Sequence, residues 1–162
     1  MVTTNKYLFR FLVLFVGLLT IPFPFNVIPK LEFVEKAIFV IYQKIVPWFG
    51  EKILNLEQPI TMFQNGSGDK TYDYLLLFLL LAIAILGTIT WSILGKKNGN
   101  YEKLNYWFLA LSRYYLGYFM IYYGLFKIMP LQFGEIAFWR LLQPYGDSSP
   151  MGLAWTFLGY SK

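Results

Sequence analysis

The residues with the clearest chemical pattern are two cations and two glycines in the third apolar stretch of the chain. Arg113, Gly117, Gly124 and Lys127 fall within ~80° of one another on a helix, at ~100° per residue, and so share one face. Aligned glycines let a second helix approach closely, and a cation at the centre of a membrane span costs at least ~2.5 kcal/mol. We therefore expect this face to bind a partner or ligand. Arg113 would either meet an acid or anionic group there, or snorkel to the lipid headgroups.

Two charged residues nearer the C-terminus are candidates for the same site. Arg140 would add positive charge, and Asp147 would pair with Arg140 at the outer rim. Aromatic side chains would supply flat apolar surface for a small molecule, namely Tyr114, Tyr118, Tyr122 and Trp139. The alternative is that these rings only anchor helices at the bilayer boundary, where tyrosine and tryptophan are enriched.

The composition excludes much catalytic chemistry. The chain has no cysteine and no histidine, so it offers no thiolate or imidazole for zinc, an iron–sulfur cluster or haem. Its acids form no recognisable catalytic motif, and the sequence lacks the glycine patterns that bind phosphates and dinucleotides. We therefore expect this chain alone to hold no catalytic site, metal or cofactor. Apolar stretches without an acid inside them also argue against a transporter.

The elements that position these residues have the composition of a membrane protein. Hydrophobic residues make up 57% of the chain and charged residues 14%, whereas a soluble domain carries about 25% charge. Three nearly uncharged runs each approach the ~20 residues that a helix needs to cross the hydrocarbon. The sequence therefore predicts an all-α fold, a polytopic membrane helical bundle with three transmembrane helices at about 8–27, 74–95 and 104–127.

The segments between these helices are mixed in character. Residues 30–55 are apolar at helical spacing but carry charges, which predicts a helix lying along the membrane interface and broken near Pro47. Packing of that helix against the bundle is the alternative. Turn-forming residues predict an outer loop at 56–72, and an outer loop with a short helix at 130–162. A cleaved signal peptide is the rival for the first helix, but the proline-rich sequence from Ile21 onward is a poor cleavage site.

Basic residues flank one end of the predicted helices. Lys6, Arg10, Lys96, Lys97 and Lys103 lie on one side if all three helices cross the membrane, whereas the long opposite segment nearly balances its charges. The positive-inside rule then places the N-terminus in the cytoplasm of a protein integral to the plasma (inner) membrane. Anchoring residues of this kind account for the net charge of +5, so we expect no nucleic-acid partner.

Several stretches of the sequence resemble a known membrane family. SRYYLGYF at 112–119 followed by GLFK at 124–127 is similar to the opening helix of the DoxX-like membrane proteins. Residues 140–160, and shorter stretches at 59–61 and 65–69, resemble a larger group of DoxX-like proteins seen in Bacteroidetes. The resemblance implies an N-terminal membrane region, 1–103, followed by the start of the family core, 104–162. That core is a four-helix bundle of which only the first helix is present, so the chain looks like the N-terminal part of a longer protein.

The resemblance also carries an expectation about function. The founding member of the family is a small subunit associated with a terminal quinol oxidase and with thiosulfate:quinone oxidoreduction. The resemblance therefore implies an accessory or scaffold subunit linked to quinone-dependent redox enzymes, in which the third helix meets a protein partner or a second copy. The alternative is a membrane protein that binds a small molecule, either a quinone or a lipid headgroup, at the same residues.

Overall fold

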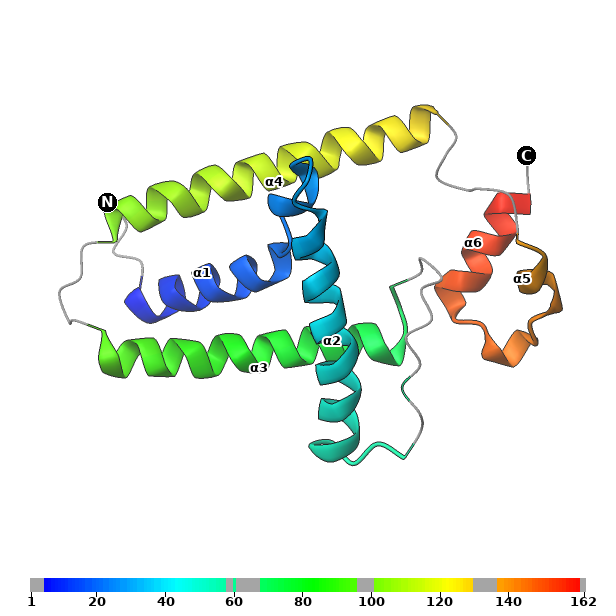
Figure 1. Ribbon diagram of the computed structural model, residues 1–162, viewed down its shortest axis with the longest axis horizontal. Helices are drawn as coiled ribbons and strands as arrows, with labels where there is room; N and C mark the ends of the chain where they lie inside the picture. The colour runs from blue at the N-terminus through cyan, green and yellow to red at the C-terminus, as the bar shows by residue number, and fades with distance from the viewer. Residues whose placement is uncertain (1–4, 58–59, 61–67, 96–100, 130–136, 161–162) are drawn as a thin grey trace.

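The chain folds into helices joined by turns (Figure 1). The computed structural model describes residues 5–57, 60, 68–95, 101–129 and 137–160. Their elements, in chain order, are α1 (Lys6–Thr20), the 3₁₀ turn η1 (Phe25–Val27), α2 (Glu32–Lys52), α3 (Thr71–Leu94), α4 (Glu102–Ile128), α5 (Phe138–Leu142), the 3₁₀ turn η2 (Tyr145–Asp147) and α6 (Pro150–Tyr160). The predicted all-α fold is confirmed for these residues.

The central helix α1 lies between α3 and α4, and the three run roughly along one direction (Figure 1). Small residues on α3 let α1 approach closely, since Ala84 is fully buried and a Cβ added at Gly87 would lie 3.1 Å from Leu14. Aromatic pairs join α1 to α4, with the ring centroids of Phe9 and Phe108 6.3 Å apart. The start of α1, the end of α3 and the start of α4 meet at one end, which we call the basic end.

The first helix is shorter than the sequence predicts. Its N-terminus is capped by Asn5, whose Oδ1 accepts a hydrogen bond from the Tyr7 N–H at 3.0 Å. It ends at Thr20 rather than near residue 27, because Ile21 precedes Pro22 and adopts an extended backbone (φ −62°, ψ 133°). The chain then continues through turns and η1 before α2 begins.

Two segments are long and apolar enough to cross a membrane, Lys6–Val27 and α3. The third predicted span coincides with α4, whose 27 residues exceed the length that a crossing needs. By the same measure of hydropathy, however, α4 is not apolar enough. The physical reason is its composition, because tyrosines and Arg113 replace the aliphatic residues that fill α3.

A long helix, α2, crosses the bundle at a steep angle to the other long helices (Figure 1). Its C-terminal half buries Val46 and Phe49 against Leu75 and Leu79 of α3, and these four side chains form one buried cluster. The predicted break near Pro47 is wrong, because α2 continues through Pro47 to Lys52. Proline removes one backbone hydrogen bond, but the buried residues on either side of it hold the helix together.

A C-terminal unit of α5, η2 and α6 lies beyond the start of α3 (Figure 1). The Asp69 carboxylate ties it to the segment before α3 by accepting a hydrogen bond from the Met151 N–H at 2.9 Å. At that junction burial lowers the pKa of Lys70, and the positive charge of Arg140 lowers it further, while the carboxylates of Asp73 and Asp69 oppose the change. Most of the predicted outer loop at 56–72 and the stretch 130–136 fall outside the described residues.

Candidate functional site

The predicted stripe on α4 is an open surface in the fold. We call Arg113, Gly117, Met120, Gly124 and Lys127 the open face of α4. Arg113 is exposed, Met120 is 73% exposed, and a Cβ added at Gly117 or Gly124 would meet no atom within 4 Å. Another helix could therefore lie directly against this backbone.

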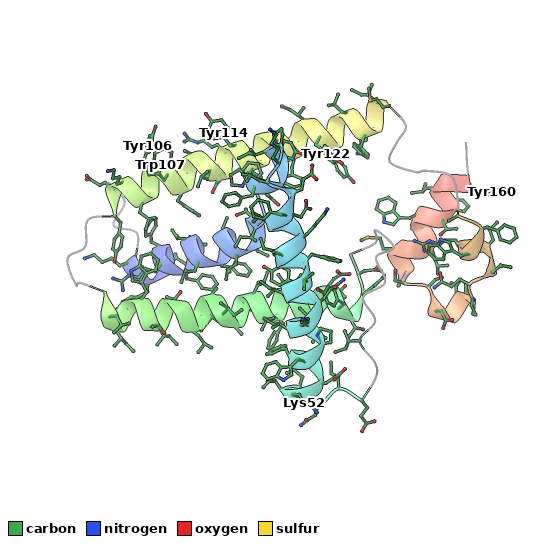
Figure 2. All side chains as sticks on the ribbon, in the orientation of Figure 1. Lys52, Tyr106, Trp107, Tyr114, Tyr122 and Tyr160 are labelled. Carbon is green, nitrogen blue, oxygen red and sulfur yellow. The ribbon has the colours of Figure 1, made fainter. Side chains whose placement is uncertain are left out.

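The opposite side of α4 is the one that packs on α1. Phe108 pairs with Phe9, and Tyr115 pairs with Phe23 at 5.4 Å between ring centroids. At ~100° per residue these contact positions lie nearly half a turn from Arg113. Figure 2 shows Tyr106 and Tyr114 on the side that points away from α1, and both are at least two-thirds exposed, at 67% and 73%. α4 therefore contacts α1 through a few aromatic rings on one side and exposes its side chains on the other.

The guanidinium of Arg113 stands far from any acid along its own helix. At ~1.5 Å of rise per residue, Arg113 lies ~16 Å from Glu102, the acid in the first turn of α4. The sequence has no acidic residue between Asp73 and Glu102, nor between Glu102 and Glu135. If α4 crosses ~30 Å of hydrocarbon, Arg113 sits near mid-depth without a carboxylate from α1, α3 or α4 at its level.

The aromatic residues predicted as a ligand surface separate into two groups. Tyr118 contacts Phe23, with ring centroids 6.0 Å apart, and therefore belongs to the packed side of α4. Tyr122 lies one turn further on, stacked against Tyr118 at 5.9 Å. The Nζ atom of Lys127 lies 5.3 Å from the centre of the Tyr123 ring, a cation–π contact at the end of the helix. The fold does not gather these rings around Arg113.

The candidate residues of the C-terminal unit lie apart from the open face of α4. The Arg140 guanidinium lies 5.3 Å from the centre of the Trp139 ring and donates a hydrogen bond to the Gly152 carbonyl at 3.5 Å. The backbone carbonyl of Asp147 accepts from the Gln143 side chain at 2.7 Å. These contacts have other partners, and the pairing of Arg140 with Asp147 stays a prediction. These residues stabilise the C-terminal unit and do not extend the stripe on α4.

A buried cation at the basic end was missed by the sequence reasoning, which treated it only as a charge that orients the helices. Arg10 is 4% exposed, and its Nε and Nη2 atoms donate to the Tyr101 hydroxyl at 3.0 and 2.5 Å. Its guanidinium also lies 5.8 Å from the centre of the Trp91 ring and 5.5 Å from that of Tyr101. A Cβ added at Gly95 would lie 3.3 Å from Nη2. We call Arg10, Trp91, Gly95 and Tyr101 the Arg10 cage.

The Arg10 cage joins three helices that are far apart in the sequence. Arg10 comes from α1, Trp91 from α3, and Tyr101 immediately precedes α4. The sequence offers only two aromatic residues, Trp91 and Tyr101, on either side of a short basic segment. Their role becomes apparent only once α1 is known to lie beside these two residues. The arrangement is suited to holding the start of α4 in place.

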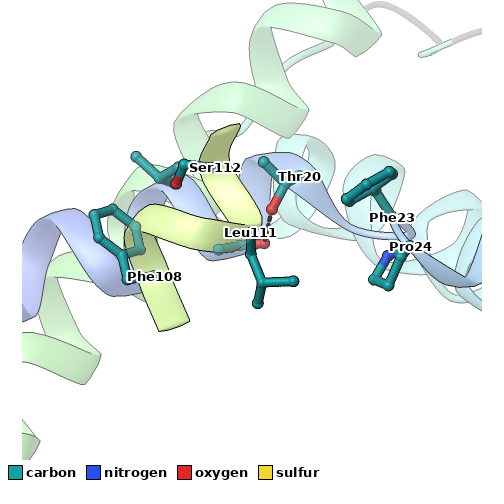
Figure 3. A pocket seen from close by; sticks show the side chains of 8 residues that line it. Thr20, Phe23, Pro24, Phe108, Leu111 and Ser112 are labelled. Carbon is teal, nitrogen blue, oxygen red and sulfur yellow. Dashed lines mark hydrogen bonds between the residues drawn. The ribbon is translucent and has the colours of Figure 1, made fainter. Parts of the chain in front are cut away.

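A small pocket lies between the end of α1 and the middle of α4 (Figure 3). Its volume is about 80 Å³, well below the ~300 Å³ at which sites for small molecules begin. Its side-chain hydroxyls come from Thr20, which donates to the Gly17 carbonyl at 3.0 Å, and from Ser112. The remaining lining is Val16, Gly17, Phe23, Pro24, Phe108 and Leu111. The pocket can take a few methylene groups but does not enclose a quinone ring.

Comparisons with known proteins find no relative of this chain. No protein-family model matches the chain, and searches among curated proteins and solved structures find no match either. The DoxX-like resemblance therefore stays a prediction, carried by the residues 112–127 and 140–160.

Proposed function

We propose that the chain is a DoxX-like integral membrane protein that acts as an accessory or scaffold subunit and recruits a protein partner through the open face of α4. Quinone-linked redox enzymes are the partner class that the DoxX-like resemblance implies. The proposal assigns the chain no reaction of its own.

Location in a membrane is supported by the surface of the helices. Two segments have the length and apolarity of a span, and α3 exposes large aliphatic side chains such as Leu86, at 64%, and Ile93, at 77%. Soluble monomers rarely expose apolar surface of this extent. The proposed topology has α1, α3 and α4 crossing an inner membrane with the basic end in the cytoplasm, as the excess of Lys and Arg there favours.

The proposed interfacial role of α2 is supported by its direction. Since α2 crosses the other long helices at a steep angle (Figure 1), it would lie along the membrane plane if they span the bilayer. Its first turn carries Glu32 and Glu35, and Lys52 ends it, so charged groups stand at both ends while Val46 and Phe49 pack inward. In this fold the interfacial position and packing against the bundle are compatible.

The observation that carries the proposed function is the open face of α4. Aromatic rings on one side of α4 contact α1, yet α4 has no buried residue along its 27 positions. Helices in a bilayer gain stability by packing against neighbours and not by leaving water, which makes glycine-bearing faces favoured contact surfaces. Arg113 on the same face needs either an anionic neighbour or, by snorkelling, contact with the headgroups. A protein partner would satisfy both needs.

Site-specific photo-crosslinking tests the proposed function. A photo-reactive residue at Met120 is expected to give an adduct with another polypeptide in the membranes of the source cell, because Met120 lies between the two open glycines. The matched control is the same residue at Leu86, which is 64% exposed on α3 and away from the open face. Gly117→Ile should reduce the Met120 adduct severalfold. Identical adducts from both positions would contradict docking at α4.

The alternative function is binding of a quinone or lipid, of which the pocket between α1 and α4 would hold a few methylene groups of the tail and not the ring or headgroup. If it holds, purification in mild detergent should retain a quinone or lipid at one equivalent per chain. Ser112→Leu would fill the pocket and release that molecule, whereas Ser92→Leu on α3, outside the pocket lining, should leave it bound. Mass spectrometry of the extracted lipids measures both. If neither the parent chain nor the Ser92→Leu control retains a quinone or lipid, this alternative is rejected.

A further inference from the structure

We propose that the Arg10 cage binds the phosphate group of an anionic phospholipid at the basic end of the bundle. The Nη1 and Nη2 atoms of Arg10 would hold the phosphate oxygens. The inference goes beyond docking at α4, and it requires only that α1 and α3 span a membrane.

The buried guanidinium uses only part of its capacity for hydrogen bonds. Arg10 is 4% exposed, and an arginine side chain carries five N–H groups. Two of them, on Nε and Nη2, converge on the Tyr101 hydroxyl. The other three find no acceptor, and the guanidinium no carboxylate, within the part of the chain that the structure describes. Because a buried charge is costly unless it is paired and hydrogen-bonded, these N–H groups are suited to an anion.

The neighbours of the guanidinium leave one of its edges available. The rings of Trp91 and Tyr101, with centres 5.8 and 5.5 Å away, attract its charge without accepting the remaining N–H groups. A Cβ added at Gly95 would lie 3.3 Å from Nη2, so a larger residue there would cover this atom. The Nη1–Nη2 edge therefore keeps the planar fork with which arginine binds two phosphate oxygens at once.

Arg10 lies at the level of the lipid headgroups if α3 spans the membrane. Trp91 belongs to the last turn of α3, and Gly95 directly follows that helix. With 24 residues, α3 is ~36 Å long at ~1.5 Å per residue, so its ends extend beyond ~30 Å of hydrocarbon. The start of α1 and the start of α4 meet this end of α3 (Figure 1). The phosphates of the adjacent leaflet are therefore the anions nearest to the cage.

The charges around the cage favour a headgroup with a net negative charge. Lys6 precedes Arg10 by one turn of α1, Lys103 lies in the first turn of α4, and both are exposed. Glu102 is the acid that the described residues place at this end. The positive N-terminus of α4 and the negative C-terminus of α3 largely offset each other. The three cations outweigh Glu102, which attracts an anionic lipid and disfavours the choline of a zwitterionic one.

A lipid titration of the full chain in neutral detergent tests the inference. Phosphatidylglycerol and phosphatidylcholine with identical acyl chains are added separately, and native mass spectrometry measures the fraction of chain that carries one lipid. We expect phosphatidylglycerol to bind at least about tenfold more tightly, because each basic residue near an anionic headgroup contributes about fivefold. A third titration adds inorganic phosphate to the chain loaded with phosphatidylglycerol, and we expect the lipid to stay bound.

Variants separate the guanidinium from the general positive charge of this end. Arg10→Gln should weaken phosphatidylglycerol binding at least about thirtyfold, since it removes hydrogen bonds from a charged donor. Lys103→Leu, the matched control, should weaken it no more than about fivefold. Tyr101→Phe removes the acceptor that the protein itself supplies, so this variant should bind phosphatidylglycerol at least as tightly as the parent. It keeps the cation, and its result therefore remains informative even if Arg10→Gln fails to fold.

Four outcomes overturn the inference: equal binding of the two lipids, equal losses in Arg10→Gln and Lys103→Leu, a loss in Tyr101→Phe as large as that in Arg10→Gln, or displacement of phosphatidylglycerol by inorganic phosphate at the same concentration. The last outcome would assign the cage to free phosphate and not to a lipid. The Met120 adduct judges the proposed docking function separately, because the lipid titration contains no partner polypeptide.

Discussion

Replacing Gly50 with leucine is expected to detach α2 from α3 and to destabilise the fold by about 1–3 kcal/mol, the usual cost of overpacking a core. Gly50 is buried where α2 meets α3, and a Cβ there would lie 2.9 Å from Cδ1 of Leu75 and 3.5 Å from Cδ1 of Leu56, with Ile60 also in its way. A leucine side chain extends further along the same direction. Thermal unfolding of the purified chain in detergent measures the change.

The control for this substitution is Gly124→Leu on α4. A Cβ at Gly124 meets no atom within 4 Å, and leucine forms helices better than glycine by several tenths of a kcal/mol. The isolated chain should therefore be as stable with Gly124→Leu as without it. Limited proteolysis of α2 provides a second measurement, because a detached α2 would be cut faster. Equal stability of the two leucine variants would show that the α2–α3 contact does not support the fold.

The sequence predicts the long helices correctly wherever charge alone defines a segment. The uncharged run before Gly95 becomes α3, and the run around Arg113 becomes α4. Helix ends and breaks depend on particular neighbours and are less well predicted. Pro22 stops α1 because Ile21 before it adopts an extended backbone, whereas Pro47 is tolerated inside α2, where Val46 and Phe49 are buried beside it.

The candidate site likewise contains residues whose placement the sequence predicts and residues whose placement it does not. Helical geometry places Arg113, Gly117 and Gly124 on one face from their spacing alone, and the structure leaves that face uncovered. The spacing does not reveal that Phe108 and Tyr115 point to α1, because that depends on where Phe9 and Phe23 fall in space. Nor does it separate the C-terminal unit from α4. Residues that share a helix face can be predicted from the helical repeat. Contacts between residues of different helices cannot, because they depend on how the helices are arranged in space.

Replacing Arg10 with leucine is expected to release the start of α4 from α1 and α3. The substitution removes both hydrogen bonds to the Tyr101 hydroxyl and the contacts of the guanidinium with the Trp91 and Tyr101 rings. Hydrogen bonds to a charged group contribute about 1.5–3 kcal/mol and a cation–π contact about 0.5–2 kcal/mol, against which stands the cost of burying the cation. We expect a net loss of about 2 kcal/mol. A spin-label distance between the first turns of α1 and α4 should lengthen and broaden.

Lys103→Leu is the matched control for Arg10→Leu, because it removes one cation from the same end of the bundle at an exposed position outside the Arg10 cage. Tyr101→Phe removes only the acceptor, so the double variant should cost less than the sum of the two single variants. Equal effects of Arg10→Leu and Lys103→Leu would show that Arg10 serves only as a positive charge. If the cage holds α4, Arg10→Leu should also reduce the Met120 adduct, although Arg10 is not part of the open face. The ring contacts of Phe23 and Phe9 with α4 would then remain to support the orientation of that face.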